Sequence, residues 1–332
     1  MRQIIKVIIL NLIIVVSCYA ADESKKMEFI NTKGQNQFEL KFENAGSFKN
    51  GYACVKLNKK WGYINAKGKI VIEPEYDYVN DFSEGLAAVK VNGKWGLINK
   101  KNKLVVKPEF DYLLLFLEGL IPAEISGKWG FINKKGKIII KPQFDLVYGF
   151  TEGFAAVKMG SKWGFIDKKG NIIIDTVYDE VNEFNMGLAP VMKGDKFGYI
   201  NKKGEYVIEP KYDYASLFSD GLALVDIQKK SGYINKKGRF IVMPIYEFGL
   251  DFFNGSAPVK IEGKFGLINK KGEFVIQPKY DFISHNNKGL VFFKENGRWG
   301  IINMKGEVVV KPTFNDIGYF KDGFALVSDS FF

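Results

Sequence analysis

Short segments in which apolar residues alternate with small or polar residues recur along most of the chain. One segment runs from Leu86 to Val91 and the next from Lys94 to Asn99, with Asn92-Gly93 between them. Alternation with a period of two predicts β-strands, and Asn-Gly is a strong signal for a two-residue hairpin turn. A third apolar segment, such as residues 137–141, follows a turn that ends in glycine. The pattern therefore predicts three antiparallel strands in each repeat.

A Trp-Gly pair, with Phe or Ser in place of Trp in three units, marks the second strand and returns every 34 residues. A fixed period without insertions predicts a tandem array in which each unit packs on its neighbours. Residues 28–332 are therefore expected to form one array of eight complete units, although a length of 332 residues would ordinarily suggest two domains. The positions of the series are Trp61, Trp95, Trp129, Trp163, Phe197, Ser231, Phe265 and Trp299.

Glycine, proline and acidic residues recur with the same period. The turn before the third strand ends in glycine in seven units and in Asn102 in the eighth, which fits a position with positive φ. An acidic residue follows an aromatic residue in seven connectors, from Asp77 to Asp281. Because an active site needs carboxylates in unlike environments, equivalent acids predict a structural role, such as hydrogen bonding to the backbone of a turn.

Two arrangements of the units remain open at this point. Propeller blades usually have four strands and about 40 to 50 residues, so a three-stranded unit of 34 residues is short for a blade. A ninth first strand, Gly323 to Val327, follows the last complete unit and is expected to cap the array. We therefore predict an all-β fold in which the units form an open, curved solenoid; the alternative is a closed, propeller-like ring.

Units of the form G[LF]AAVKxxxKWGFIxKKGxxVIxPxYD resemble WG (KWG) repeats, which are β-repeats of many bacterial exported proteins. The resemblance covers most of the chain. It implies a tandem β-repeat module that is often exported and has no common catalytic activity, and it assigns no role to any single residue.

The N-terminal residues are typical of a secretory signal peptide. Arg2 and Lys6 precede an apolar segment from Val7 to Val16, which is too short to span a bilayer. Residues 1–20 are therefore predicted to be a signal peptide and residues 21–27 a polar lead-in. Cleavage after Ala20 and lipobox-like cleavage before Cys18, which would then be lipidated, both remain open. We expect a protein exported to the periplasm, the cell surface or the medium.

Pairs of lysines occupy the turn between the second and third strands, in a chain with 48 basic and 37 acidic residues. Stacked units would align these lysines in a ridge that attracts anionic glycans, lipopolysaccharide or lipid headgroups, with an affinity that falls as salt rises. Alternatively, the lysines are solvated residues that keep strand edges from pairing between molecules. Lys67 and Lys305 share this turn position, and the candidate binding residues are Lys100, Lys101, Lys134, Lys135, Lys168, Lys169, Lys202, Lys203, Lys236, Lys237, Lys270 and Lys271.

Composition argues against most enzyme classes. One histidine, His285, and two cysteines, Cys18 and Cys54, leave little from which to build a metal site or a His-based triad, and no nucleophile or phosphate-binding motif is present. The Trp/Phe series is expected to pack in the core, with Ser231 leaving a gap, and the apolar residues 113–117 are expected to be buried against the next unit.

These features together predict an exported, non-enzymatic β-repeat scaffold that binds a protein or a surface polymer of the cell envelope. The alternative is electrostatic binding of anionic glycans or lipid headgroups through the lysine ridge. We expect no cofactor and no metal. Nucleic acid is an improbable partner for an exported chain, and a monomer is expected.

Overall fold

The computed structural model describes residues 27–39, 41–285 and 287–330. The predicted signal peptide, Cys18 and nearly all of the polar lead-in lie outside these residues. The described chain consists of β-strands and turns, and within it no helix is long and apolar enough to cross a membrane. It divides into two compact units: unit 1 contains the residues before position 150 and those from 314 onward, and unit 2 contains residues 150–313.

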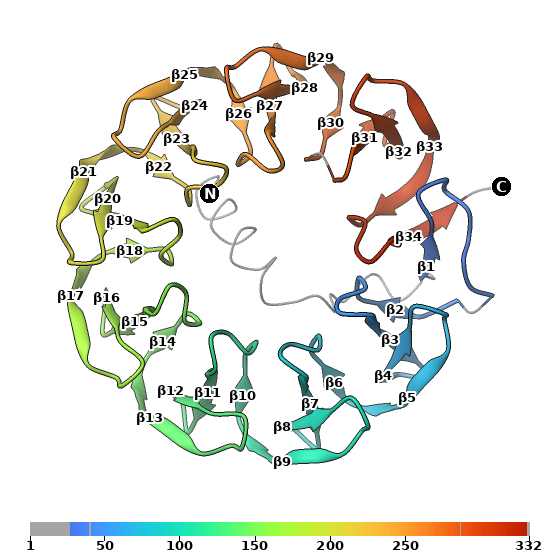
Figure 1. The fold of residues 1–332 in the computed structure, drawn as a ribbon, viewed down its shortest axis with the longest axis vertical. Coiled ribbons are helices and arrows are strands. Elements are labelled where there is room, and N and C mark those ends of the chain that lie inside the picture. The colour runs from blue at the N-terminus through green and yellow to red at the C-terminus, as the bar shows by residue number, and fades with distance from the viewer. Residues whose placement is uncertain (1–26, 40, 286, 331–332) are drawn as a thin grey trace. The chain divides into compact units, whose positions relative to one another are not determined.

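The strands are labelled in Figure 1 and recur in groups of four. Those of unit 1 are β1 (Met27–Ile30), β2 (Asn44–Ala45), β3 (Tyr52–Leu57), β4 (Lys60–Asn65), β5 (Ile70–Tyr76), β6 (Tyr78–Val79), β7 (Leu86–Val91), β8 (Lys94–Asn99), β9 (Leu104–Phe110), β10 (Tyr112–Leu113), β11 (Ile121–Ile125), β12 (Lys128–Ile132), β13 (Ile138–Phe144), β14 (Leu146–Val147) and β34 (Ala325–Ser330). Those of unit 2 are β15 (Ala155–Met159), β16 (Lys162–Ile166), β17 (Ile172–Tyr178), β18 (Glu180–Val181), β19 (Leu188–Lys193), β20 (Lys196–Asn201), β21 (Tyr206–Tyr212), β22 (Tyr214–Ala215), β23 (Ala223–Ile227), β24 (Lys230–Ile234), β25 (Phe240–Tyr246), β26 (Phe248–Gly249), β27 (Ser256–Ile261), β28 (Lys264–Asn269), β29 (Phe274–Tyr280), β30 (Phe282–Ile283), β31 (Leu290–Glu295) and β32 (Arg298–Asn303). Strand β33 (Val308–Ile317) begins in unit 2 and ends in unit 1.

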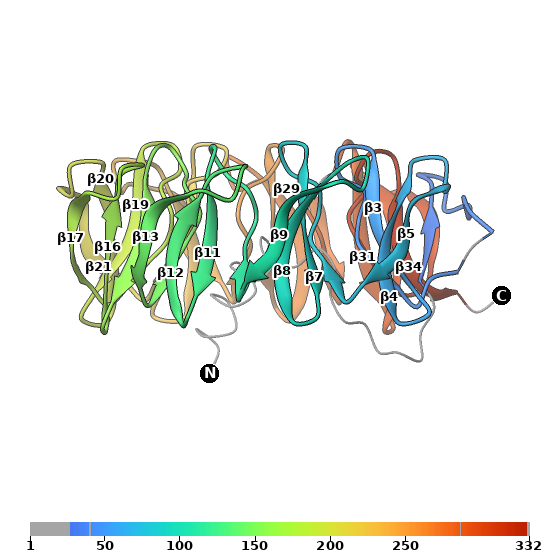
Figure 2. The same ribbon diagram turned by 90° about the horizontal axis from the view of Figure 1, so that it is seen from below.

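Each repeat forms a small antiparallel sheet, here called a blade, with its strands in chain order, as in β6-β7-β8-β9. Figure 2 shows β7, β8 and β9 side by side. The predicted hairpins are confirmed, but the predicted number of three strands is wrong. The connector contributes a fourth, two-residue strand, because Tyr78 and Val79 pair with Lys90 and Val89. This strand is too short for an alternating pattern to reveal it.

Steric crowding explains why glycine follows the Trp/Phe position in each repeat. A Cβ atom at Gly96 would lie 2.6 Å from the carbonyl oxygen of Val106 and 2.8 Å from the nitrogen of Pro108. At this point the register between β8 and β9 shifts, from Trp95 opposite Phe110 to Leu97 opposite Val106. Proline is tolerated in the last strand of a blade because it occupies this bulge on an edge strand. The bulge therefore needs the glycine but only tolerates the proline, because the same register shift occurs in the repeat that has Thr176 in place of proline.

Most rings of the Trp/Phe series lie in the core, as predicted, whereas Trp129 and Trp299 are partly exposed. Trp61 and Trp95 are buried, and Tyr78 packs between them with both ring centroids 5.8 Å away. In unit 2 the series is interrupted at Ser231, which is also buried and whose hydroxyl donates to Asp226 Oδ1 at 2.6 Å. The aromatic residues therefore join neighbouring blades by packing, and not by the hydrogen-bonding capacity of the indole.

The first described strand closes the array. β1 pairs with β34 in antiparallel register, with Ile30 opposite Ala325 and Met27 opposite Ser328 (Figure 1). The two ends of the array are therefore joined by a strand pair, as the closed, propeller-like alternative requires, and the predicted open solenoid is not confirmed. Gly323 to Val327 does not cap the array, because its missing partner strand comes from the N-terminal end of the chain.

This closing blade is assembled from both ends of the chain, within unit 1. Met27 lies one period before Trp61, so residues 27–30 form the second strand of a ninth repeat in which Met27-Glu28 replaces Trp-Gly. Its last strand is reduced to isolated bridges, Met27 with Phe42 and Ile30 with Asn36. In the other repeats, glycine at this position leaves room for the backbone of the last strand, and a glutamate side chain does not. Instead, Glu28 accepts a hydrogen bond from Asn36 and forms an ion pair with Lys41.

Candidate functional site

The lysine-bearing turns are built alike in every repeat. In the turn after β12, Asn133 Oδ1 accepts hydrogen bonds from the backbone N–H groups of Lys135 and Lys137, at 2.9 and 3.1 Å. The N–H of Gly136 donates to the carbonyl of Asn133, and Gly136 has φ of 79°. Asparagine or aspartate at the first position therefore fixes the loop by side-chain-to-backbone bonds. The second lysine of the pair sits at the tip of this rigid turn.

Among the described residues, nine such turns present an exposed second lysine whose backbone N–H donates to the Asn or Asp side chain two residues earlier. In unit 1 these are Lys33, Lys67, Lys101 and Lys135. In unit 2 they are Lys169, Lys203, Lys237, Lys271 and Lys305. Lys33 is not among the candidates predicted from the sequence, because its repeat lacks the Trp-Gly pair. Lys33 lies one 34-residue period before Lys67, and this spacing identifies it.

The first lysines of the pairs are placed differently, because several contact the preceding blade. Lys134 Nζ lies 3.2 Å from Glu84 Oε2 and 4.9 Å from the centroid of the Phe116 ring. Lys202 contacts Glu152 in the same way, and Lys236 Nζ donates to the carbonyl of Met186 at 2.6 Å. Lys100 lies over the ring of Tyr52. These lysines hold blades together, so the twelve candidate lysines do not form one uniform ridge.

The recurring acids of the connectors also join blades. Asp111 Oδ1 pairs with Lys94 of the preceding blade at 2.5 Å, and its Oδ2 accepts from the N–H of Ser126 at 2.6 Å. Asp77, Asp179 and Asp281 bind the equivalent lysine and hairpin turn. The lysine hydrogen bond lowers the pKa of each of these carboxyl groups below its ordinary value. The prediction of a structural role is confirmed.

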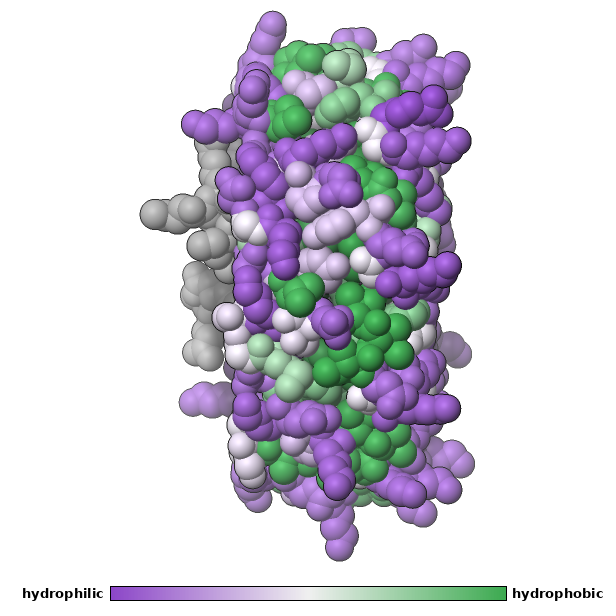
Figure 3. All heavy atoms as spheres, turned by 90° about the vertical axis from the view of Figure 1, so that its left-hand side faces the viewer, coloured by the Kyte–Doolittle hydropathy of each residue, from purple (hydrophilic) through white to green (hydrophobic). Residues whose placement is uncertain are grey.

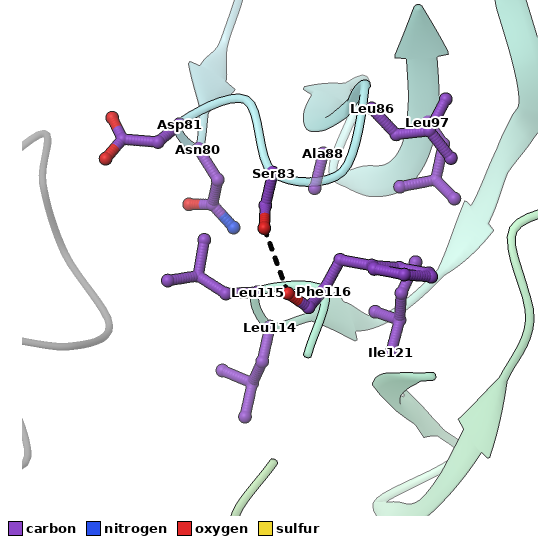
Figure 4. A pocket seen from close by; sticks show the side chains of 10 residues that line it. All are labelled: Asn80, Asp81, Ser83, Leu86, Ala88, Leu97, Leu114, Leu115, Phe116 and Ile121. Carbon is purple, nitrogen blue, oxygen red and sulfur yellow. Dashed lines mark hydrogen bonds between the residues drawn. The ribbon is translucent and has the colours of Figure 1, made fainter. Parts of the chain in front are cut away.

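A small pocket in unit 1 lies where the apolar residues 113–117 meet the neighbouring blade (Figure 4). Ser83 Oγ donates to the carbonyl of Phe116 at 3.0 Å, and Asn80 Nδ2 donates to the carbonyl of Leu113 at 3.3 Å. Leu113 and Phe116 are buried, whereas Leu114 and Leu115 remain partly exposed. Leu113 and Phe116 thus pack against the preceding blade, in one core cluster with Ala88 and Leu97, and not against the next unit as expected. The polar groups of the pocket bond to the backbone across the blade junction.

Two buried tyrosines and His285 bond to backbone carbonyl oxygens. The hydroxyls of Tyr63 and Tyr199 donate to the carbonyls of Asn80 and Ser216, and burial raises the pKa of both phenols. His285 Nε2 lies 2.7 Å from the carbonyl oxygen of Asp251, and burial lowers the pKa of the imidazole. Among the described residues, no group of three or more His, Cys, Asp or Glu side chains is placed to hold a metal ion.

The last strand of each blade exposes apolar side chains. Figure 3 shows the side of the molecule that carries β17 and β21, where hydrophobic patches lie between hydrophilic side chains. Ile172, Ile173 and Val207 are each more than two-fifths exposed there. These apolar positions and the second lysines are both exposed to a partner.

The chain matches the model of the WG containing repeat in nine consecutive segments from residue 29 to residue 329: 29–61, 61–95, 95–129, 129–163, 163–197, 197–230, 232–265, 265–299 and 299–329. A comparison with curated protein sequences gives no match.

Solved structures resemble the fold at low sequence identity. One described as the crystal structure of the eukaryotic initiation factor has a TM-score of 0.60 at 10% identity, over 86% of this chain and 94% of that one. Hsv2 of Kluyveromyces lactis has a TM-score of 0.39 at 10% identity, over 56% and 70% of the two chains. PorZ, a surface component of the type-IX secretion system of Porphyromonas gingivalis, has a TM-score of 0.35 at 8% identity, over 77% and 44%. Of these three, the first supports the fold, and none of them assigns a function.

Proposed function

Because this chain belongs to the WG-repeat family, we propose that it is an exported, non-catalytic scaffold that binds an anionic polymer of the cell envelope through the second lysines of its turns. The observation that carries the proposal is the identical construction of nine turns, each with an exposed lysine at its tip. Export is supported by the apolar segment from Val7 to Val16 and the basic residues before it.

Lysines that recur at one position of every repeat can bind a polymer that carries regularly spaced anionic groups. A single exposed lysine binds an anionic group weakly, because water and salt screen the charge. Several lysines engaged by one polymer bind far more tightly, since every contact after the first is intramolecular. The connector acids pair with lysines such as Lys94, and the first lysines Lys134 and Lys202 pair with Glu84 and Glu152. Within the described residues, none of the second lysines forms an ion pair, so their charges face solvent.

The test measures retention of the protein on alginate beads and on vesicles that contain phosphatidylglycerol, as salt is raised. Three second lysines are replaced in one variant, Lys101→Gln, Lys135→Gln and Lys305→Gln. The matched control replaces three exposed lysines on the last strands of the same blades, Lys107→Gln, Lys141→Gln and Lys311→Gln. Both variants lose the same charge.

We expect the turn variant to elute at clearly lower salt than the wild type and the control to elute close to the wild type. Retention on alginate alone points to a glycan, and retention on vesicles alone points to lipid headgroups. Equal loss in both variants would mean that only net charge matters. Absence of retention at low salt would exclude the proposal and favour a protein partner.

A further inference from the structure

Strand β25 in unit 2 carries an exposed apolar strip. Ile241, Met243 and Ile245 are 45%, 61% and 54% exposed, and Met243 is the most exposed large apolar side chain among the described residues. The three residues alternate with Val242, which is buried, and Pro244, so they point to the same side of the strand. A continuous exposed strip of this kind is uncommon on a strand that faces water.

The strip distinguishes β25 from the last strands of the other blades. The position of Met243 is occupied elsewhere by charged or amide side chains, which are Glu73, Lys107, Lys141, Asp175, Glu209, Gln277 and Lys311. Such residues discourage contact between the edge strands of different molecules. β25 alone among these strands lacks that protection at its centre.

The sequence of β25 is complementary to itself in antiparallel orientation. When two copies are placed about a two-fold axis through Met243, Ile241 of one faces Ile245 of the other, and Arg239 faces Glu247. In β21 the same operation places Glu205 against Asp213, which are like charges. Only β25 combines an apolar centre with opposite charges at its two ends.

Arg239 and Glu247 are also available for such a contact. Within the described part of the chain, neither side chain forms an ion pair. Glu247 occupies the position of the connector acids, yet Lys230, seventeen residues earlier, does not pair with it as Lys196 pairs with Asp213. Its carboxylate accepts one long hydrogen bond, from the N–H of Gly263 at 3.3 Å.

We propose that β25 is a self-association surface, on which a second copy of this chain docks antiparallel, with Met243 on the two-fold axis and Arg239 facing Glu247 of the other copy. A two-fold interface uses the same patch on both protomers, as this one does. Three side chains bury far less than the roughly 800 Å² per partner of a stable complex. The dimer is therefore weak and forms as the local concentration rises, for example when many copies bind one polymer. This differs from the monomer that the sequence suggested.

Sedimentation velocity over micromolar to sub-millimolar concentrations tests the proposal. We expect the weight-average sedimentation coefficient of the wild type to rise with concentration, and that of Ile241→Lys to stay at the monomer value. The matched control is Ile173→Lys, which changes a residue in the same position of the repeat and with the same exposed fraction of 45%. It should associate as the wild type does. Thermal unfolding of both variants establishes that they are folded.

Charge reversal tests the register. Arg239→Glu alone places like charges together and should weaken association at least several-fold, whereas the double variant Arg239→Glu with Glu247→Arg should restore it. Three results would each overturn the proposal: a wild type that stays monomeric at all concentrations, a dimer that survives Ile241→Lys, and a double variant that associates no better than Arg239→Glu. These measurements contain no alginate, so their outcome does not depend on whether the protein binds an anionic polymer.

Discussion

Phe29, close to the N-terminal end of the described chain, lies opposite Leu326, close to its C-terminal end, in the strand pair that closes the array. The ring of Phe29 is buried and packs against Phe38, Phe42 and Phe48, with centroid distances of 5.7, 6.0 and 5.0 Å. Phe324, from the C-terminal end, packs against Phe38 and Phe48. Aromatic side chains from both ends of the chain thus share one hydrophobic cluster.

Replacement of Phe29 should weaken this closure. Truncation of a buried phenylalanine typically costs about 3 to 5 kcal/mol, so Phe29→Ala is expected to lower the free energy of unfolding by about that much in urea titrations. The closing blade should lose amide-exchange protection first, because both of its halves depend on the cluster. The control is Phe253→Ala, which truncates a half-exposed ring and should change stability little. Equal effects of the two substitutions would show that the Phe29 cluster does not hold the closure.

Any side chain at the glycine of the Trp-Gly pair should lower the stability of the fold. In Gly96→Ala the added methyl group meets the backbone of β9, which cannot rotate away as a side chain can. We expect a loss of about 1 to 3 kcal/mol or more, as for other overpacked sites, measured by urea denaturation. Gly318→Ala is the comparison, since a Cβ there finds its nearest neighbour at 3.6 Å. A tolerated Gly96→Ala would show that the bulge is not the reason for this glycine.

Trp95 should tolerate phenylalanine far better than alanine. Its Nε1 atom is buried and has no hydrogen-bond partner in the described part of the chain, so Trp95→Phe removes an unsatisfied donor while it keeps most of the ring. The loss in Trp95→Ala should be about 3 to 5 kcal/mol, because the space between Tyr78 and Tyr112 would be left empty. Similar losses for both variants in thermal unfolding would point to a need for the indole itself.

The connector acids should make the free energy of unfolding fall at acid pH. Ion pairing with Lys162 and a hydrogen bond from the Gly194 N–H lower the pKa of Asp179 in the folded state. Because the pKa of Asp179 is lower in the folded than in the unfolded state, its carboxylate stabilises the fold at pH values above the unfolded-state pKa of about 3.9. This stabilisation is lost as the pH falls through the folded-state pKa.

Urea midpoints at pH 7 and pH 3 check this dependence. The wild type should lose more stability between the two pH values than Asp179→Asn, which lacks the titrating group. The matched variant is Asp195→Asn, at an exposed position of the hairpin turn in the same repeat, and it should keep the pH dependence of the wild type. A steeper acid loss in Asp179→Asn than in the wild type would contradict the linkage.

The sequence by itself determined the repeat, its hairpins and its core. Alternation identified the strands, the period identified equivalent residues, and the burial of Trp95 followed from the substitution of phenylalanine at its equivalents. These properties are local: they depend on the spacing of residues within one or two units, which the sequence displays directly.

Only the tertiary structure decided how the array ends and which lysines are available. Closure depends on a contact between Phe29 and Leu326, at opposite ends of the chain, and the repeat that makes it lacks its Trp-Gly signature. Adjacent lysines such as Lys134 and Lys135 look equivalent in sequence, yet Lys134 contacts Glu84 and Lys135 faces solvent. Such differences arise from packing between blades, because a neighbouring blade brings its acidic and aromatic side chains to one lysine and not to the next.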